Sequence, residues 1–278
     1  MKKFLNLYML AILPMLTAVV LMGVLVNGQP SWIAWTSLAA GALCWLGILT
    51  YAAFYPPSQL FGRVIAVGDH SERLIALTFD DGPCAPYSSL LLEVLKKFEV
   101  RATFFVVGKN VEKYPAIVQQ MVSQGHAVGN HTYSHVSLIN CGLEELTVQL
   151  TKTQEILKRV TGYPATIFRP PYGLRDPRVI SMAHALGLQV IQWGISSWDW
   201  RCPGAQQIAD HVLRRARPGA IVLLHDGAEN TSKPDRRQTI EAVALLIPQL
   251  RNLGYRFATV PELVTNSRME QLVTSYPR

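Results

Sequence analysis

The stretch "RLIALTFDDGPC", Arg73–Cys84, ends an apolar run with two adjacent acidic residues. Leu74–Phe79 consists of aliphatic, aromatic and β-branched residues, which is typical of a buried strand, and the Gly-Pro pair that follows predicts a turn. Asp80 and Asp81 are therefore expected at the carboxyl end of a strand or in the loop after it. By themselves, two such acids are better explained by a solvated turn or a helix N-cap, so their role depends on the rest of the chain.

Downstream of this stretch, strand-like runs alternate with amphipathic, helix-like ones. The predicted strands are Leu74–Phe79, Ala102–Val107, Ala127–Gly129, Thr166–Phe168, Gln189–Gly194, Ala220–Leu224 and Arg256–Thr259. The predicted helices between them are Tyr87–Phe98, Ala116–Gln124, Leu143–Thr161, Arg178–Leu186, Ala205–Ala216 and Thr239–Leu253. This alternation predicts an α/β fold with about seven parallel strands, open or closed into a barrel.

The N-terminal region has a different composition. After Lys2 and Lys3 no charged residue occurs before Arg63, and two long apolar runs, Phe4–Val26 and Trp32–Tyr55, flank a short polar connector. Because about 20 apolar residues suffice to cross a bilayer, we expect two transmembrane helices. A cleaved signal peptide is the alternative for the first run, although that run is long for one and no Ala-x-Ala site follows it.

This composition predicts two domains, a membrane hairpin over residues 1–56 and a catalytic domain over residues 57–278. The basic residues flank the hairpin while its connector is uncharged, so the positive-inside rule predicts an integral, two-pass membrane protein whose catalytic domain is cytoplasmic. An extracytoplasmic domain remains the alternative. The chain has a net charge of +7, but its basic residues are too dispersed to indicate nucleic-acid binding. The four cysteines show no disulfide spacing.

Polar clusters come directly after five of the predicted strands. Asp80 and Asp81 follow the first, and the others are "NHTYSH" (130–135), "RPPYG" (169–173), "SSWDW" (196–200) and "HDG" (225–227). In an α/β barrel the carboxyl ends of all strands meet at one rim. We therefore expect these five segments to form a single site.

Two histidines in the second cluster have the spacing of metal ligands. His131 and His135 are four residues apart, so that a helical turn or a short loop would bring them together. Alone, the pair is at least as well explained by solvated or core histidines. Two imidazoles and a carboxylate at the same rim, however, are typical ligands of a divalent metal with open coordination positions. One acid of the Asp80 and Asp81 pair would then bind the metal while the other accepts a proton from water.

His225 and Arg169 are the remaining candidates at this rim. A histidine titrates near neutrality and can donate a proton to a leaving amine or alcohol, whereas the alternative is a buried histidine bonded to Asp226. Arg169 could pair with a carboxylate and keep it ionised, or lie on the surface as a solvated cation.

The ordered set "TFDDG", "HTYSH", "RPPYG", "SSWDW" and "LLHDG" resembles the NodB-type polysaccharide deacetylases, carbohydrate esterase family four, over about Leu74 to Leu263. This resemblance implies a distorted (β/α) barrel. It also implies hydrolysis of N-acetyl groups, less often O-acetyl or N-formyl groups, from sugars with a divalent metal, commonly zinc.

The resemblance also implies roles for individual residues. Asp80 corresponds to the general base, His225 to the general acid and Arg169 to the partner that orients the base. The residues that correspond to the metal ligands are Asp81, His131 and His135.

On the substrate side, the resemblance assigns the backbone N–H of Tyr172 to the oxyanion and the side chains of Trp200 and Leu223 to the pocket for the acyl methyl group. Asp199 matches the second acid of the family's Asp-x-x-Asp-Trp motif. The first acid, which can support the catalytic histidine, is replaced here by Ser196. Asp199, Asp226 or a water would then have to support His225.

These features predict a metal-dependent N-deacetylase or deformylase that acts on an amino sugar of a cell-envelope glycan or of its lipid-linked precursor. An extracytoplasmic deacetylase of peptidoglycan or of an exported polysaccharide is the first alternative. A catalytically silent glycan-binding protein is the second, but such a protein would be expected to lack a ligand or the base, and all are present.

Overall fold

The computed structural model describes residue 18, residues 31–227 and residues 235–265. Within them, parallel strands form one eight-stranded sheet in the order β5-β4-β3-β2-β1-β7-β6, with β8 paired to β1. The strands are β1 (Leu74–Asp80), β2 (Thr103–Val106), β3 (Ala127–Asn130), β4 (Ile167–Phe168), β5 (Gln189–Val190), β6 (Ile195–Ser196), β7 (Ala220–His225) and β8 (Arg256–Phe257). The predicted α/β fold with a parallel sheet is confirmed.

The apolar stretch before the two acids forms the central strand, β1, and every residue of β1 is buried. Ile75, Leu77 and Phe79 belong to one hydrophobic core, whereas Leu74 and Ala76 belong to a second, smaller one. Since successive strand residues point to opposite faces, β1 is packed on both faces, and this explains why its sequence is almost continuously apolar.

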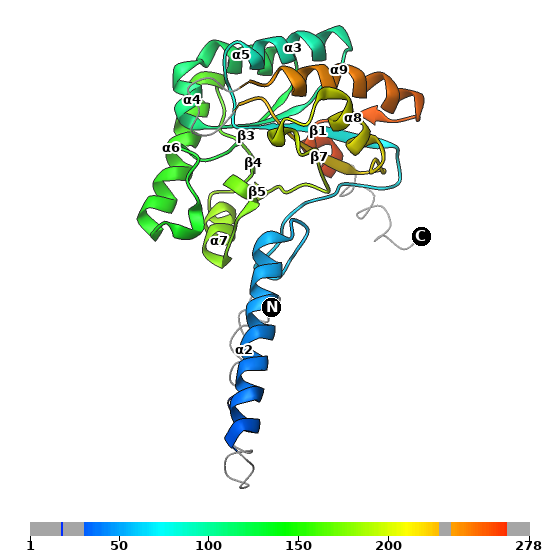
Figure 1. Cartoon of the computed structure of the whole chain (residues 1–278). Coiled ribbons are helices and arrows are strands. Elements are labelled where there is room, and N and C mark those ends of the chain that lie inside the picture. Colours follow the sequence, from blue (N-terminus) through cyan, green and yellow to red (C-terminus); the bar gives the residue numbers. More distant parts are fainter. Residues whose placement is uncertain (1–17, 19–30, 228–234, 266–278) are drawn as a thin grey trace, which may run out of the picture.

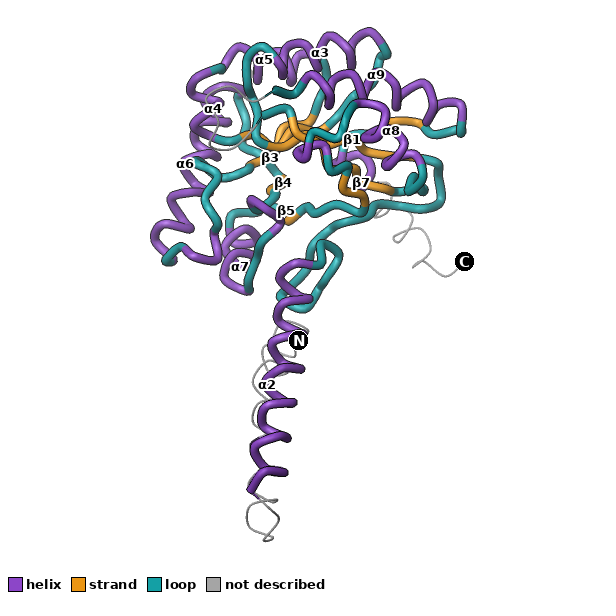
Figure 2. The backbone as a smooth tube through the Cα atoms, viewed as in Figure 1, coloured by secondary structure: helices purple, strands orange, loops and turns teal. Residues whose placement is uncertain are grey.

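Helices cover the outer face of the curved sheet, while the strands lie at the centre of the α/β domain (Figures 1 and 2). The helices are α2 (Ser31–Phe54), α3 (Tyr87–Lys97), α4 (Gly108–Lys113), α5 (Pro115–Ser123), α6 (Leu143–Thr161), α7 (Pro177–Ala185), α8 (Ala205–Leu213) and α9 (Arg237–Asn252). Three short 3₁₀ turns are η1 (Leu138–Asn140), η2 (Pro171–Gly173) and η3 (Asp199–Arg201). The six helices predicted after residue 57 are confirmed, with ends that shift by a few residues, and α4 was not predicted.

The prediction of a single strand over Gln189–Gly194 is wrong, because successive residues there bond to different strands. Ile191 N donates to Phe168 O, whereas Gly194 N donates to Ile221 O, so the chain leaves β4 and reaches β7 within a few residues. Between them, Gln192 N donates to Ile65 O at 2.7 Å. Only the first two residues of the predicted strand form β5, and β6 begins directly after it, at Ile195, so the two strands lie at opposite ends of the strand order. Ile191 and Gln192, which follow β5, are bonded to the earlier segment around Ile65.

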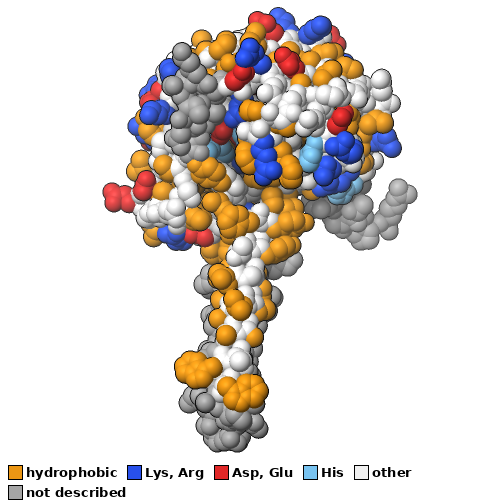
Figure 3. All heavy atoms as spheres, in the orientation of Figure 1, with side chains coloured by type: hydrophobic (Ala, Val, Ile, Leu, Met, Phe, Trp, Pro, Cys, Tyr) orange, Lys and Arg blue, Asp and Glu red, His pale blue; other side chains and the backbone are white. Residues whose placement is uncertain are grey.

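Helix α2 projects away from the α/β domain (Figure 1), and apolar side chains are exposed along it (Figure 3). Trp32, Trp35 and Leu43 are among the exposed ones. Among the residues that the structure describes, no helix combines the length and the apolar character needed to span a membrane. The two transmembrane helices predicted from the sequence are therefore unsupported. The run predicted as the second span folds as α2, and the first, Phe4–Val26, lies outside the described residues apart from residue 18.

Candidate active site and metal site

The two acids lie where β1 ends beside β7. Asp80 is the last residue of β1 and pairs in register with His225, the last residue of β7. Asp81 follows with a φ of 73°, so its side chain leaves in a different direction from that of Asp80. Asn110 Nδ2 donates to Asp81 O at 2.8 Å and fixes this turn. Gly82 is required next, because a Cβ at this position would collide with the Asp226 carboxylate.

A loop, and not a helix, brings the two histidines together after β3. The Asn130 side chain accepts from Thr132 N at 2.8 Å, and the Thr132 hydroxyl accepts from His135 N at 3.0 Å. Thr132 and His135 both have positive φ, which curls the chain tightly. The rings of His131 and His135 consequently lie with centroids 4.9 Å apart.

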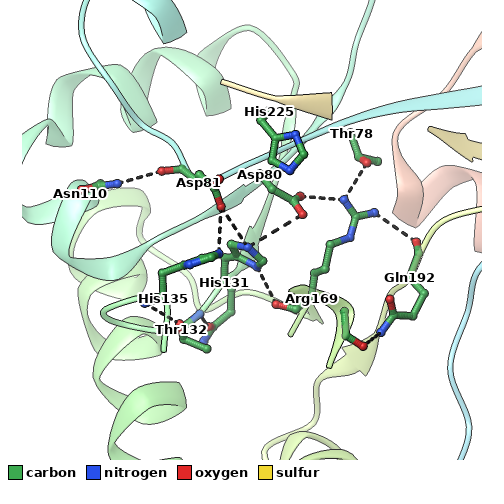
Figure 4. Close-up of polar contacts among 12 residues, drawn as sticks. Thr78, Asp80, Asp81, Asn110, His131, Thr132, His135, Arg169, Gln192 and His225 are labelled. Atoms are coloured by element: carbon green, nitrogen blue, oxygen red, sulfur yellow. Dashed lines mark hydrogen bonds and ion pairs between the residues drawn. The ribbon is translucent and has the colours of Figure 1, made fainter. Parts of the chain in front are cut away.

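Asp81, His131 and His135 form a candidate metal site in which their donor atoms lie within 4.8 Å of one another. His131 Nε2 and His135 Nε2 lie 3.4 and 3.0 Å from Asp81 Oδ1 (Figure 4). His131 Nδ1 must carry the proton, because it donates to the carbonyl of Arg169 at 2.7 Å, and this leaves Nε2 as a metal donor. Two imidazoles and a carboxylate fit a divalent cation with open positions.

The charge state of Asp81 suits this role. Burial alone would raise the pKa of Asp81, but the hydrogen bonds from His131 and His135 outweigh it and hold the pKa well below its usual value. The carboxylate is therefore ionised at neutral pH, as a metal ligand must be.

Arg169 binds Asp80 inside the protein. Its guanidinium is fully buried and donates from Nη1 to Asp80 Oδ1 at 2.7 Å and to the Thr78 hydroxyl at 2.8 Å. Its Nη2 donates to Gln192 O at 3.1 Å (Figure 4). Burial lowers the pKa of Arg169, while the Asp80 charge acts in the opposite direction. Asp80 is thereby fixed with its other oxygen, Oδ2, 3.9 Å from His131 Nε2.

Asp199 supports His225 in place of the acid that Ser196 replaces. His225 Nδ1 lies 2.7 Å from Asp199 Oδ1, and His225 N donates to Asp199 Oδ2 at 2.9 Å. Burial would lower the pKa of His225, but the charge and hydrogen bond of Asp199 raise it to about 9, with a further contribution from Asp81 and Asp80. His225 is therefore held as a proton donor, and it faces the two acids from the side opposite His131 in Figure 4.

The three predicted substrate residues lie around this site. Tyr172 has a φ of 59° in η2, is about half exposed and places its ring edge-on to His135, with centroids 5.0 Å apart. Trp200 is half exposed on η3, directly after Asp199. Leu223 is buried on β7, in register with Thr78. The structure thus brings all ten predicted residues to the carboxyl end of the sheet, and the individual roles stay predictions.

The sequence did not point to several supporting side chains. Asn110 follows β2 and could have been found by the rule that polar residues after strands belong to the rim. Thr239 donates to Asp199 Oδ2 at 2.9 Å, and Thr78 and Gln192 hold Arg169. For these three residues no sequence signal was available, because their role depends on contacts between distant segments.

With this geometry established, comparison with known proteins places the chain in a family. Residues 67–191 match the family model for polysaccharide deacetylases. The chain is 37% identical over 201 residues to a peptidoglycan-N-acetylglucosamine deacetylase of Bacillus cereus, covering 72% of each chain. A crystal structure of the Bc1960 peptidoglycan N-acetylglucosamine deacetylase superposes with a TM-score of 0.69 at 36% identity, covering 73% of this chain and 92% of the other. The protein therefore belongs to the polysaccharide deacetylase family, and its deacetylase relatives are hydrolases of carbon-nitrogen bonds other than peptide bonds.

The fold by itself does not separate active from inactive members. A wild-type pseudoenzyme of the same esterase family from Bacillus anthracis superposes with a TM-score of 0.66 at 29% identity, covering 72% of this chain and 68% of the other. Activity must consequently be argued from the site residues.

Proposed function

We propose that this protein removes an N-acyl group, acetyl or formyl, from an amino sugar of a cell-envelope glycan or its lipid-linked precursor in a metal-dependent reaction. The observation that carries the proposal is the complete set at one rim: Asp81, His131 and His135 beside Asp80, with His225 facing them. Zinc is the metal we propose, because two imidazoles and a carboxylate are common zinc ligands.

The residues divide the chemistry between them. A divalent cation held by Asp81, His131 and His135 would supply Lewis acidity toward the acyl carbonyl and toward water. Asp80 takes a proton from the attacking water while Arg169 fixes the carboxylate in place. The water oxygen bonds to the acyl carbon, and the Tyr172 backbone N–H stabilises the oxygen that becomes negative.

His225 completes the reaction. When the carbon-nitrogen bond breaks, the protonated imidazole donates its Nε2 proton to the departing amine, since Asp199 already occupies Nδ1. The products are the free amino sugar and a carboxylate. The second proposed alternative, a silent glycan-binding protein, is disfavoured because the base, the acid and the three candidate ligands are all in place.

Acetate release tests the proposal. The full chain is stripped with a chelator, reloaded with zinc and assayed on an N-acetylglucosamine tetramer and on peptidoglycan fragments. Stripping should abolish acetate release and zinc should restore it, whereas Asp81→Ala should lower both bound zinc and activity by roughly a thousandfold or more. The exposed Glu72→Gln should match the wild type. Undiminished activity of the stripped protein would contradict the metal dependence.

The location of the catalytic domain is proposed from the charge distribution of the sequence alone. Lys2, Lys3 and Arg63 support a cytoplasmic site, where the substrate would be a lipid-linked precursor. Fusions of green fluorescent protein and of alkaline phosphatase after Arg278 test this. A fluorescent, phosphatase-inactive pair supports the proposal, and the reverse pair would put the site outside and make assembled glycans the substrates.

A further inference from the structure

The turn after β6 presents an aromatic surface beside the catalytic histidine. It contains η3, and its ends have left-handed backbone, with a φ of 59° at Trp198 and 51° at Cys202. Asp199 is 1% exposed, whereas its neighbours Trp198 and Trp200 are 47% and 51% exposed. The same turn therefore directs one acid into the site and two indole rings to the surface.

This turn is held rigidly. The Asp199 carboxylate accepts from Ser197 Oγ at 2.9 Å, from Thr239 Oγ1 at 2.9 Å and from His225 N at 2.9 Å, besides the contact with His225 Nδ1. Because these bonds fix the residue between the two tryptophans, the exposed rings are positioned before any ligand arrives. A preorganised surface loses less conformational entropy on binding.

Arg201 lies against both rings. Its guanidinium carbon is 4.7 Å from the ring centroid of Trp198 and 4.8 Å from that of Trp200. Contacts with aromatic faces leave the N–H groups at the edge of the guanidinium plane available. No hydrogen bond or ion pair holds the exposed Arg201 side chain within the part of the chain that the structure describes.

The turn also packs against α8. Trp198 contacts His211 of α8, with ring centroids 5.0 Å apart. Burial lowers the pKa of His211, and the neighbouring charges of Arg215 and Arg214 lower it further. His211 is therefore neutral at neutral pH and adds no charge beside Trp198.

We propose that Trp198, Arg201 and Trp200 form a subsite for an oxyanion carried by the glycan substrate, a carboxylate or a phosphate on the acylated sugar or on the sugar next to it. The indole faces pack against the apolar face of a sugar ring, and Arg201 donates a bidentate pair of hydrogen bonds to the oxyanion. This inference rests on the proposed function and assigns Trp198 and Arg201, which lie outside the acyl pocket.

The test compares three substrates in the zinc-loaded full chain. They are a neutral N-acetylglucosamine tetramer, a carboxylate-bearing disaccharide of N-acetylglucosamine and N-acetylmuramic acid, and N-acetylglucosamine 1-phosphate. The readout is the ratio of kcat/KM for each anionic substrate to that for the neutral one. Arg201→Gln should lower this ratio roughly tenfold, since a charge-assisted hydrogen bond is lost, and Arg201→Lys should lower it less.

Arg251→Gln is the matched control, because Arg251 is an exposed arginine at the end of α9 that donates to Phe98 O, before β8 and so at the opposite end of the sheet. Its ratio should equal that of the wild type. The carboxylate and phosphate arms show which anion is preferred. An unchanged ratio in Arg201→Gln, or a wild type that prefers the neutral tetramer, would overturn the subsite.

A binding measurement separates the subsite from the proposed function. Tryptophan fluorescence is titrated with N-acetylglucosamine 1-phosphate and with N-acetylglucosamine in wild type and Arg201→Gln. If the wild type binds N-acetylglucosamine 1-phosphate more tightly than N-acetylglucosamine and Arg201→Gln does not, the subsite is supported. This holds even if no substrate is deacetylated, because a lack of deacetylation would contradict only the proposed function. Equal binding of both sugars by the wild type would remove the subsite.

Discussion

Two arginines, Arg169 at the start of the "RPPYG" segment and Arg175 two residues after it, are both buried, yet they have different partners. Arg169 is 0% exposed and faces the Asp80 carboxylate, whereas Arg175 is 1% exposed and, among the described residues, donates only to carbonyl groups. The carbonyls that accept from Arg175 belong to Ala53, Tyr55, Pro56, Ser58 and Gly173. Burial lowers the pKa of Arg175 to about 10, so it also remains charged at neutral pH.

The difference shows that the partner decides what a buried cation does. Arg169 stabilises a charge at the reacting centre, so its removal should alter chemistry. Arg175 ties the end of α2 and the residues after it to the loop that carries Tyr172, so its removal should alter stability. Substitutions of these arginines and of other charged residues test this contrast.

Arg169→Met should lower kcat/KM for acetate release by roughly 10² to 10⁴-fold, because the buried Asp80 loses the cation that pairs with it and holds it in place. Arg169→Lys restores the charge and should recover part of the activity. The measurement is kcat/KM with bound zinc and far-ultraviolet circular dichroism as controls. A folded, zinc-loaded Arg169→Met with wild-type activity would refute the assigned role.

Asp199→Asn tests a second charge pair at the same site. Removing the negative charge should lower the pKa of His225 and shift the alkaline limb of the pH-rate profile to lower pH, with kcat reduced by roughly 10 to 10²-fold. An alkaline limb that stays at the wild-type pH would show that Asp199 does not tune His225.

The raised pKa of His225 also predicts that the stability of the protein changes with pH. In the metal-free protein the pKa of His225 is raised from 6.5 to about 9, so its stabilising effect is complete below about pH 6.5 and lost as the pH rises through about 9. Urea unfolding of metal-free wild type should show this decline, and Asp199→Asn should show a smaller one. Parallel curves for the two proteins would contradict the coupling.

Arg175→Met should destabilise the protein by about 3 kcal/mol while leaving kcat/KM, measured well below the melting temperature, within roughly fivefold of wild type. Several carbonyls lose a charged donor, but no group at the reacting centre loses a partner. A loss of activity as large as that of Arg169→Met in a folded protein would contradict a purely structural role for Arg175.

The exposed ion pair of Arg256 and Glu72 should contribute least to the free energy of unfolding. Its atoms lie 2.7 Å apart, but the side chains are 68% and 49% exposed. Glu72→Gln should change the free energy of unfolding by less than about 0.5 kcal/mol, because solvent and salt screen such pairs. A larger change in urea unfolding would mean that exposure is a poor guide to the strength of ion pairs in this protein.

The spacing of apolar residues, and the glycine and proline residues between the apolar runs, predicted most of the fold. Leu143–Thr161 was predicted from its amphipathic pattern and has the observed bounds. In the structure a glycine flanks each end, and Gly162 takes the left-handed conformation of a helix C-cap. The end of β5 at Val190 and the start of β6 at Ile195 were missed, since they depend on partners such as Ile65 and Ile221 that local sequence does not reveal. Helix α4 is only six residues long and lacks a clear apolar period.

The sequence predicted which residues form the site, but not which side chains they contact. Strand ends and the family resemblance indicated Asp80, His131 and His225, but three supports for His225 remained open until the structure selected Asp199, 26 residues away in the chain. Arg175 was missed altogether, because an arginine in a polar segment normally lies on the surface and only the fold buries it.

The activity of Asp80→Asn in the zinc-loaded full chain tests the proposed role of Asp80 as the base most directly. Asparagine keeps the size and most contacts of the side chain but cannot accept a proton, so kcat for acetate release should fall by roughly 10² to 10⁴-fold with unchanged bound zinc and circular dichroism. Wild-type kcat in that folded, metal-loaded variant would contradict the assignment of Asp80 as the base.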